Sequence, residues 1–116
     1  MSDEFVQRFL GAENTKEALA WLKAGPDNIH TLAEGLPTEN SIELIQGFYD
    51  AGAKEVLAVE IDEYDDFQNT GKLVIELSDD PAERAAVLEK ADEIAISQGF
   101  NPEQDSGQRY VFLMLD

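Results

Sequence analysis

Runs of apolar residues, partly alternating with polar ones, predict four β-strands. Aliphatic and β-branched side chains fill Glu55–Ile61 and Lys72–Leu77, and an acidic segment joins these two stretches. Arg109–Leu115 is almost entirely apolar, which is typical of a strand that is covered on both faces. Asn28–Glu34 fits a short strand, although the same letters could also extend a helical region.

Other stretches carry apolar residues at helical spacing and predict three helices, Thr15–Ala24, Ser41–Ala51 and Pro81–Gln98. Each follows a residue whose side chain can accept hydrogen bonds from the first helical turn, and each is followed by a glycine that can end it. The expected capping residues are Asn14, Asn40 and Asp80. A further short helix is expected at the start of the chain. Its apolar residues are Phe5, Val6, Phe9 and Leu10.

From Asn28 onward, the order strand, helix, strand, strand, helix, strand is that of the ferredoxin-like split βαβ arrangement. We therefore expect one α+β domain over residues 1–116. It consists of an N-terminal helical segment, 1–26, and a ferredoxin-like βαββαβ unit, 27–116, with a four-stranded antiparallel sheet. Right-handed crossovers place both helices of that unit on one face of the sheet.

The second face of this sheet needs a cover, because it is too apolar to face water. The N-terminal helical segment, which contains Trp21, is the expected cover, and a homodimer through the open sheet face is the alternative. The side chains expected on that face are Val56, Ala58 and Val74, together with either Tyr110, Phe112 and Met114 or the residues that alternate with them.

Eight Lys and Arg residues face twenty-five Asp and Glu residues, so the formal net charge is -17. Nucleic acids and anionic membranes attract clustered positive charge, and this composition argues against both as partners. The chain has no cysteine, which excludes disulfides, zinc–thiolate sites and cysteine nucleophiles. It also lacks a signal-like start and any run of about 20 apolar residues, so we expect a soluble, cytoplasmic protein.

The ferredoxin-like topology predicts where negative charge gathers. Its first and second strands run parallel, as do its third and fourth, so the segments 35–40, 62–70 and 100–108 leave the sheet at the same end. We expect this acidic end to bind a basic protein partner; solvated loops without a partner are the alternative. The acidic residues expected there are Glu39, Asp62, Glu63, Asp65, Asp66, Glu103 and Asp105.

The loop between the two central strands also offers oxygen ligands for calcium or magnesium. The candidate metal ligands are Asp62, Asp65, Asp66 and Asn69. Their spacing does not match the EF-hand pattern, and a solvated hairpin loop is the alternative.

Catalytic patterns are sparse. Glu60 and Glu76 interrupt apolar strands and would form a carboxylate pair if they faced each other; the alternative is that they point outward or meet lysine or arginine. The single histidine, His30, excludes a multi-histidine metal centre. It is expected to pack beside the N-terminal segment or to face solvent. No phosphate-binding glycine loop or Gly-x-Ser-x-Gly sequence is present.

These patterns together favour a small, acidic, non-catalytic protein-interaction or regulatory domain without a cofactor. A small-ligand or divalent-cation sensor is the alternative. An enzyme that uses Glu60 or Glu76 is a third hypothesis, because this architecture hosts enzymes, sensors and adaptors alike.

Overall fold

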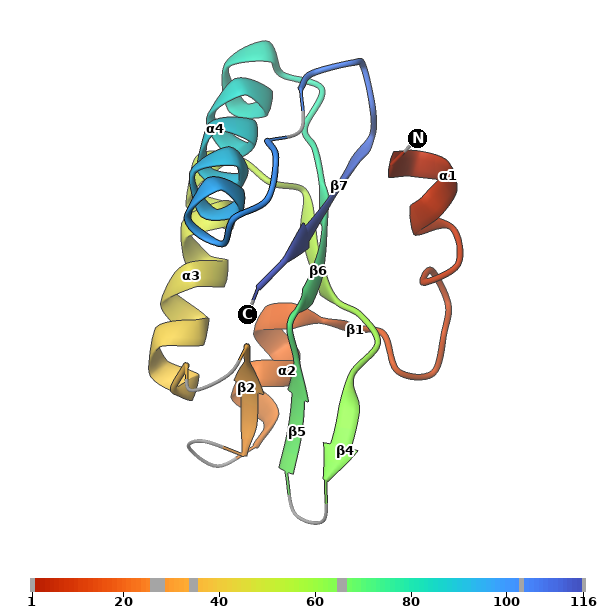
Figure 1. Ribbon diagram of the computed structural model, residues 1–116, viewed down its shortest axis with the longest axis vertical. Coiled ribbons are helices and arrows are strands. Elements are labelled where there is room, and N and C mark those ends of the chain that lie inside the picture. The colour runs from red at the N-terminus through yellow and green to blue at the C-terminus, as the bar shows by residue number, and fades with distance from the viewer. Residues whose placement is uncertain (1, 26–28, 34–35, 65–66, 103, 116) are drawn as a thin grey trace.

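The computed structural model describes residues 2–25, 29–33, 36–64, 67–102 and 104–115 (Figure 1). The helices are α1 (Ser2–Val6), α2 (Ala18–Ala24), α3 (Thr38–Ala51) and α4 (Pro81–Ser97). The strands are β1 (Lys16–Glu17), β2 (His30–Leu32), β3 (Glu55–Ala58), β4 (Asp62–Tyr64), β5 (Phe67–Thr70), β6 (Lys72–Glu76) and β7 (Tyr110–Met114).

The strands form two sheets. The main sheet has four antiparallel strands in the order β1-β3-β6-β7. The second sheet has the order β2-β5-β4, in which β2 runs parallel to β5 and β4 runs antiparallel to it. The predicted α+β class and four-stranded antiparallel sheet are therefore confirmed.

A long hairpin links the two sheets, because β3 leads into β4 and β5 leads into β6. The hairpin bends between the sheets, where Glu60 has a φ of 51°. Opposite this bend, a side-chain carbon added to Gly71 would lie 2.4 Å from the Leu115 carbonyl oxygen. The Leu115 N–H donates to the Gly71 carbonyl oxygen at 2.6 Å, so the close approach of these two backbones requires glycine.

The ferredoxin-like strand order is not formed. β7 pairs directly with β6 in the antiparallel sense, and β2 lies in the second sheet. The reversal of β7 follows from the connection after α4, which returns along that helix before the last strand begins. Asp105 and Gln108 accept hydrogen bonds from Arg84, in the first turn of α4. The chain therefore enters β7 at the end of the sheet where β6 finishes.

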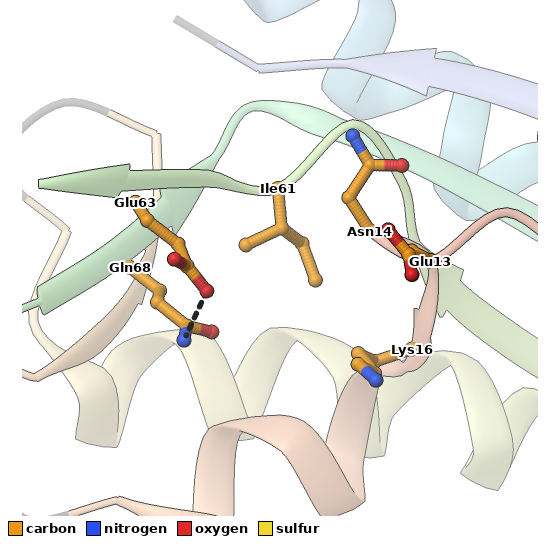
Figure 2. A pocket seen from close by; sticks show the side chains of 6 residues that line it. All are labelled: Glu13, Asn14, Lys16, Ile61, Glu63 and Gln68. Carbon is orange, nitrogen blue, oxygen red and sulfur yellow. Dashed lines mark hydrogen bonds between the residues drawn. The ribbon is translucent and has the colours of Figure 1, made fainter.

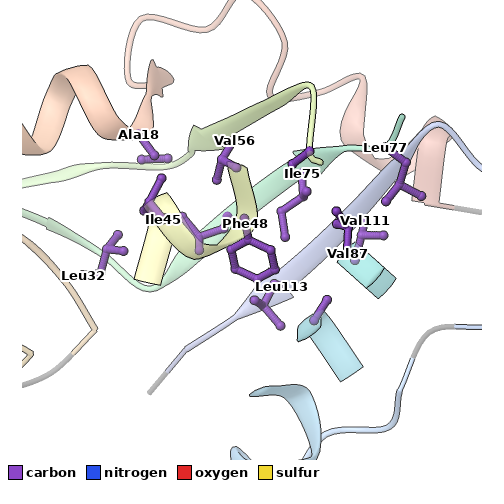
Figure 3. Close-up of a cluster of buried hydrophobic side chains, with 14 of the residues drawn as sticks. Ala18, Leu32, Ile45, Phe48, Val56, Ile75, Leu77, Val87, Val111 and Leu113 are labelled. Carbon is purple, nitrogen blue, oxygen red and sulfur yellow. The ribbon is translucent and has the colours of Figure 1, made fainter. Parts of the chain in front are cut away.

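Helices cover both faces of the main sheet, with α3 and α4 on one face and α1 on the other (Figure 1). The larger core lies under α2, α3 and α4, where Phe48 is fully buried. Figure 3 shows its ring among side chains of β6 and β7, including Ile75 and Leu113. This core contains most of the buried apolar residues of the described chain, and burial of apolar side chains is the main source of hydrophobic stabilisation.

The smaller core lies under α1. Val6 and Phe9 pack there with residues of the sheet, and the Phe9 ring stacks on Phe112 with centroids 5.6 Å apart. The predicted cover of the second face by the N-terminal segment is thus confirmed for its first residues. It is wrong for Trp21, which belongs to the larger core. It is also wrong for Val56 and Ala58, which belong to the larger core, whereas Leu57 between them packs against the smaller core because successive strand residues face opposite sides.

Helix α4 begins as predicted, with Pro81 first and the Asp80 carboxylate accepting from the Glu83 N–H at 3.0 Å. Two other starts differ from the prediction. Helix α3 begins at Thr38, with Pro37 as its N-cap and no side-chain capping bond. Helix α2 begins at Ala18, because the preceding two residues pair with β3.

Candidate functional site

Beyond its bend, the long hairpin leaves the main sheet and ends in an arm formed by β4 and β5 (Figure 1). The arm is anchored on its β5 side. There the Gln68 N–H donates to the Ile29 carbonyl oxygen at 2.8 Å. The Asn69 side-chain amide donates to the carbonyl oxygens of Thr31 and Ala33 at 3.1 and 2.7 Å. β4 is the outer strand of this sheet, and all its residues are exposed.

Two aromatic residues stand opposite each other on the arm. Tyr64 and Phe67 are register partners, with ring centroids 5.5 Å apart, and are 49% and 46% exposed. Asp62 and Glu63 precede Tyr64 in β4 and are exposed as well. We call these four residues the arm surface. It combines apolar ring area with carboxylates on a segment that protrudes from the molecule.

A cavity of about 400 Å³ adjoins the arm. Its lining residues are Glu13, Asn14, Lys16, Ile61, Glu63 and Gln68 (Figure 2). Two carboxylates and one ammonium group give this lining a formal charge of -1.

One hydrogen-bond chain links the cavity to helix α2. The Gln68 side-chain amide donates to Glu63 Oε1 at 3.2 Å, the contact drawn in Figure 2. The same amide accepts from the Trp21 indole N–H at 2.8 Å. Trp21 in turn stacks on His30, with ring centroids 5.1 Å apart, so His30 packs beside the N-terminal segment as expected. The cavity wall is therefore connected to the single tryptophan of the chain.

The predicted acidic end is not assembled as expected. Because β7 runs antiparallel to β6, the chain before β7 lies at the end of the main sheet away from the arm. Asp62 and Glu63 are on the arm, whereas Asp105 lies beside the start of α4, and Glu39 is exposed in the first turn of α3. The remaining candidates, Asp65, Asp66 and Glu103, lie outside the described residues.

Asp105 has a structural role of its own. Both of its carboxylate oxygens accept from the Arg84 Nε–H at 3.0 Å, and Oδ1 also accepts from Arg84 Nη2 at 2.8 Å and from the Gly107 N–H at 3.1 Å. These bonds, chiefly those from Arg84, hold the pKa of Asp105 below its ordinary value. This carboxylate is engaged within the chain.

The metal-site prediction is only partly covered by the structure. Asp62 and Asn69 are register partners on the arm, while Asp65 and Asp66 lie outside the described residues. Within the described ranges, no cluster of three or more His, Asp or Glu side chains could hold a metal ion. Cation binding at the arm stays a prediction.

Glu60 and Glu76 do not form a carboxylate pair in the structure. Glu60 pairs with Lys72, and Glu76 Oε2 lies 2.8 Å from Arg109 Nε. The structure therefore agrees with the predicted alternative, in which each carboxylate forms an ion pair with a lysine or an arginine.

A second cavity, of about 310 Å³, gathers positive charge. Lys54, Arg84 and Arg109 line it. Each has a carboxylate partner, at 3.5 Å for Lys54, 2.8 Å for Arg84 and 2.8 Å for Arg109. These cations are neutralised locally, so the cavity offers no surplus positive charge to an anion.

Comparison with models of protein families, with curated proteins and with solved structures finds no match for this chain. Over the described ranges, no helix has the length and apolar character needed to cross a membrane.

Proposed function

We propose that this protein is a non-catalytic interaction protein that binds a basic protein partner through the arm surface. The observation that carries the proposal is the aromatic pair Tyr64 and Phe67, about half exposed on a protruding hairpin and preceded by two exposed acids. Aromatic residues are enriched among those that dominate binding energy at interfaces. Burying both rings against a partner would also remove apolar area from water.

Charge favours a basic partner. The whole chain carries a formal charge of -17, and a field of that sign speeds encounter with a positively charged protein. At contact, an arginine side chain can lie over an aromatic ring and pair with a neighbouring carboxylate. Cation–ring contacts already occur within this protein, where the Arg8 guanidinium lies 4.7 Å from the Phe5 ring centroid.

The proposal is tested with nona-arginine as the probe and with two charge-neutral double variants. The first variant, Tyr64→Ala with Phe67→Ala, removes the aromatic pair and leaves the net charge unchanged. The matched control, Ile96→Ala with Phe100→Ala, removes two other exposed apolar side chains, 61% and 40% exposed. Affinity is measured by calorimetry at low salt.

We expect the arm variant to bind about tenfold more weakly, because two exposed cation–ring contacts are worth about 1.5 kcal/mol. The control variant should bind as the wild type does. Equal affinity of both double variants would show that the probe responds only to overall charge, and would refute the proposed use of the arm.

A further inference from the structure

One edge of the second sheet is open along β4. On the same side of the hairpin, the Ile61 N–H still donates to the Asn14 carbonyl oxygen at 3.1 Å. Asn14 lies just before β1, which pairs with β3. β5 lies on one side of β4, and past Ile61 the sheet order of the described residues places no strand on the other side. On this side of the hairpin, β1 therefore pairs with β3, and the edge along β4 stays open.

The register shows which backbone groups this edge presents. The Gln68 N–H donates to Ile29, next to β2, and so points away from β4. Gln68 and Glu63 are directly opposite in the antiparallel pair. In such a pair, both residues direct their N–H and C=O groups either toward each other or away. The Glu63 N–H and C=O therefore point away from β5, toward the open edge.

The Glu63 side chain lies beside the same edge, because it lines the 400 Å³ cavity. Glu13 and Lys16 line that cavity too (Figure 2). A residue that paired with Glu63 across the edge would direct its side chain to the face on which Glu63 lies. That side chain would meet two carboxylates and one ammonium group.

We propose that an extended, basic segment of the partner adds as a strand to β4 and pairs with Glu63 through two backbone hydrogen bonds. The partner residue opposite Glu63 is an arginine whose side chain enters the cavity between Glu13 and Glu63. This inference rests on the proposed function, and charge complementarity selects the occupant. Strand addition supplies affinity through the backbone, and the side-chain pocket supplies specificity.

The probe is the capped peptide acetyl-Val-Thr-Arg-Thr-Val-amide, titrated into the full chain at low salt. Binding is followed by NMR through the Glu63 amide and the Trp21 indole signals, since Trp21 is linked to Glu63 through Gln68. Methylating the arginine backbone nitrogen removes one edge hydrogen bond and should weaken binding about fivefold. Replacing arginine by neutral citrulline should weaken it about threefold.

Two substitutions in the cavity lining should change the affinity for the peptide in opposite directions. Glu63→Gln should weaken binding about threefold, whereas Lys16→Gln, which removes the opposing ammonium group, should strengthen it about twofold. Glu89→Gln makes the same charge change as Glu63→Gln at an exposed position of α4 and should have no comparable effect.

Two results would overturn strand addition. One is the absence of binding at millimolar probe; the other is equal affinity for the methylated and unmethylated peptides. Tyr64→Ala with Phe67→Ala separates this failure from that of the proposed function. If backbone methylation has no effect but loss of the rings weakens nona-arginine binding, the arm binds basic partners by another geometry.

Discussion

Substitution of Tyr49 by phenylalanine tests how the helices are tied to the main sheet. The Tyr49 hydroxyl donates to Glu17 Oε2 at 2.5 Å and accepts from the Val56 N–H at 2.9 Å. The same Glu17 carboxylate accepts from the Leu19 and Ala20 N–H groups at 3.0 and 2.7 Å, and so caps α2. One hydroxyl therefore joins α2, α3 and β3.

Tyr49→Phe removes a hydrogen bond to a charged group, which is worth about 1.5–3 kcal/mol. It also leaves the Val56 N–H without its acceptor, at a cost of about 1–3 kcal/mol. Glu17 keeps the hydrogen bonds from its two backbone donors, so we expect the summed cost of the two losses to lie near the lower limits of these ranges. The free energy of unfolding should drop by about 2.5 kcal/mol.

The effect depends on pH in a defined direction. Burial, followed by the hydrogen bond to Glu17, raises the pKa of Tyr49 well above its ordinary value of 10.0. The folded protein thus holds this proton more tightly than the unfolded chain does. The resulting stabilisation is complete below pH 10 and is lost as the pH rises above that value. The difference in the free energy of unfolding between wild type and Tyr49→Phe should therefore become smaller above pH 10.

Urea unfolding at pH 7 and at a series of alkaline pH values measures both quantities. The matched control is Tyr64→Phe, which removes a hydroxyl from the exposed arm and should change stability by less than about 0.5 kcal/mol. A Tyr49→Phe protein as stable as this control at pH 7 would refute the role assigned to the hydroxyl.

Two further substitutions and two changes of solution conditions also have defined expected results. Phe9→Ala should lower the free energy of unfolding by about 3 kcal/mol in urea, because Phe9 is buried against Phe112. Asp105→Asn should destabilise the protein at pH 7 but not well below pH 3.8: the lowered pKa makes this carboxylate stabilising above its ordinary value of 3.8, and the effect is lost in acid. Binding of nona-arginine, measured by calorimetry, should weaken steeply between low and physiological salt. Millimolar calcium or magnesium at fixed ionic strength should raise the melting temperature no more than sodium does; a metal-specific rise would favour the cation-sensor alternative.

Local signals in the sequence correctly predict those helix ends that depend only on residues next to them. Helix α4 begins at Pro81 because Asp80 caps it, and helix α3 ends at Ala51 because Gly52 caps it with a φ of 115°. Both features need only residues within one turn of the helix end. The same reasoning failed for α2, where pairing of Lys16 with Ala58 extends the chain as a strand just before the helix.

The strand order could not be predicted from these signals, because it depends on where long connections travel. The chain after α4 runs back to Arg84 before it enters β7, and this return reverses the last strand. The second sheet depends on β2 (His30–Leu32), which is only three residues long. Its pairing with β5 joins segments 38 residues apart, Thr31 and Asn69.

The candidate site was predicted only in part. The partner surface that the sequence predicts contains Asp62 and Glu63 but neither Tyr64 nor Phe67. A signal was present, since these aromatic residues flank the two residues between β4 and β5. The bend at Glu60, which carries the hairpin out of the main sheet, leaves no comparable signal, because residues other than glycine seldom adopt a positive φ.

The most direct test of the arm as the binding surface is an amide NMR titration of the full chain with nona-arginine at low salt. If the arm binds the basic partner, the largest shift changes will fall on residues 61–64 and 67–69. Changes concentrated on α4, or spread evenly over the acidic surface, would contradict the proposal.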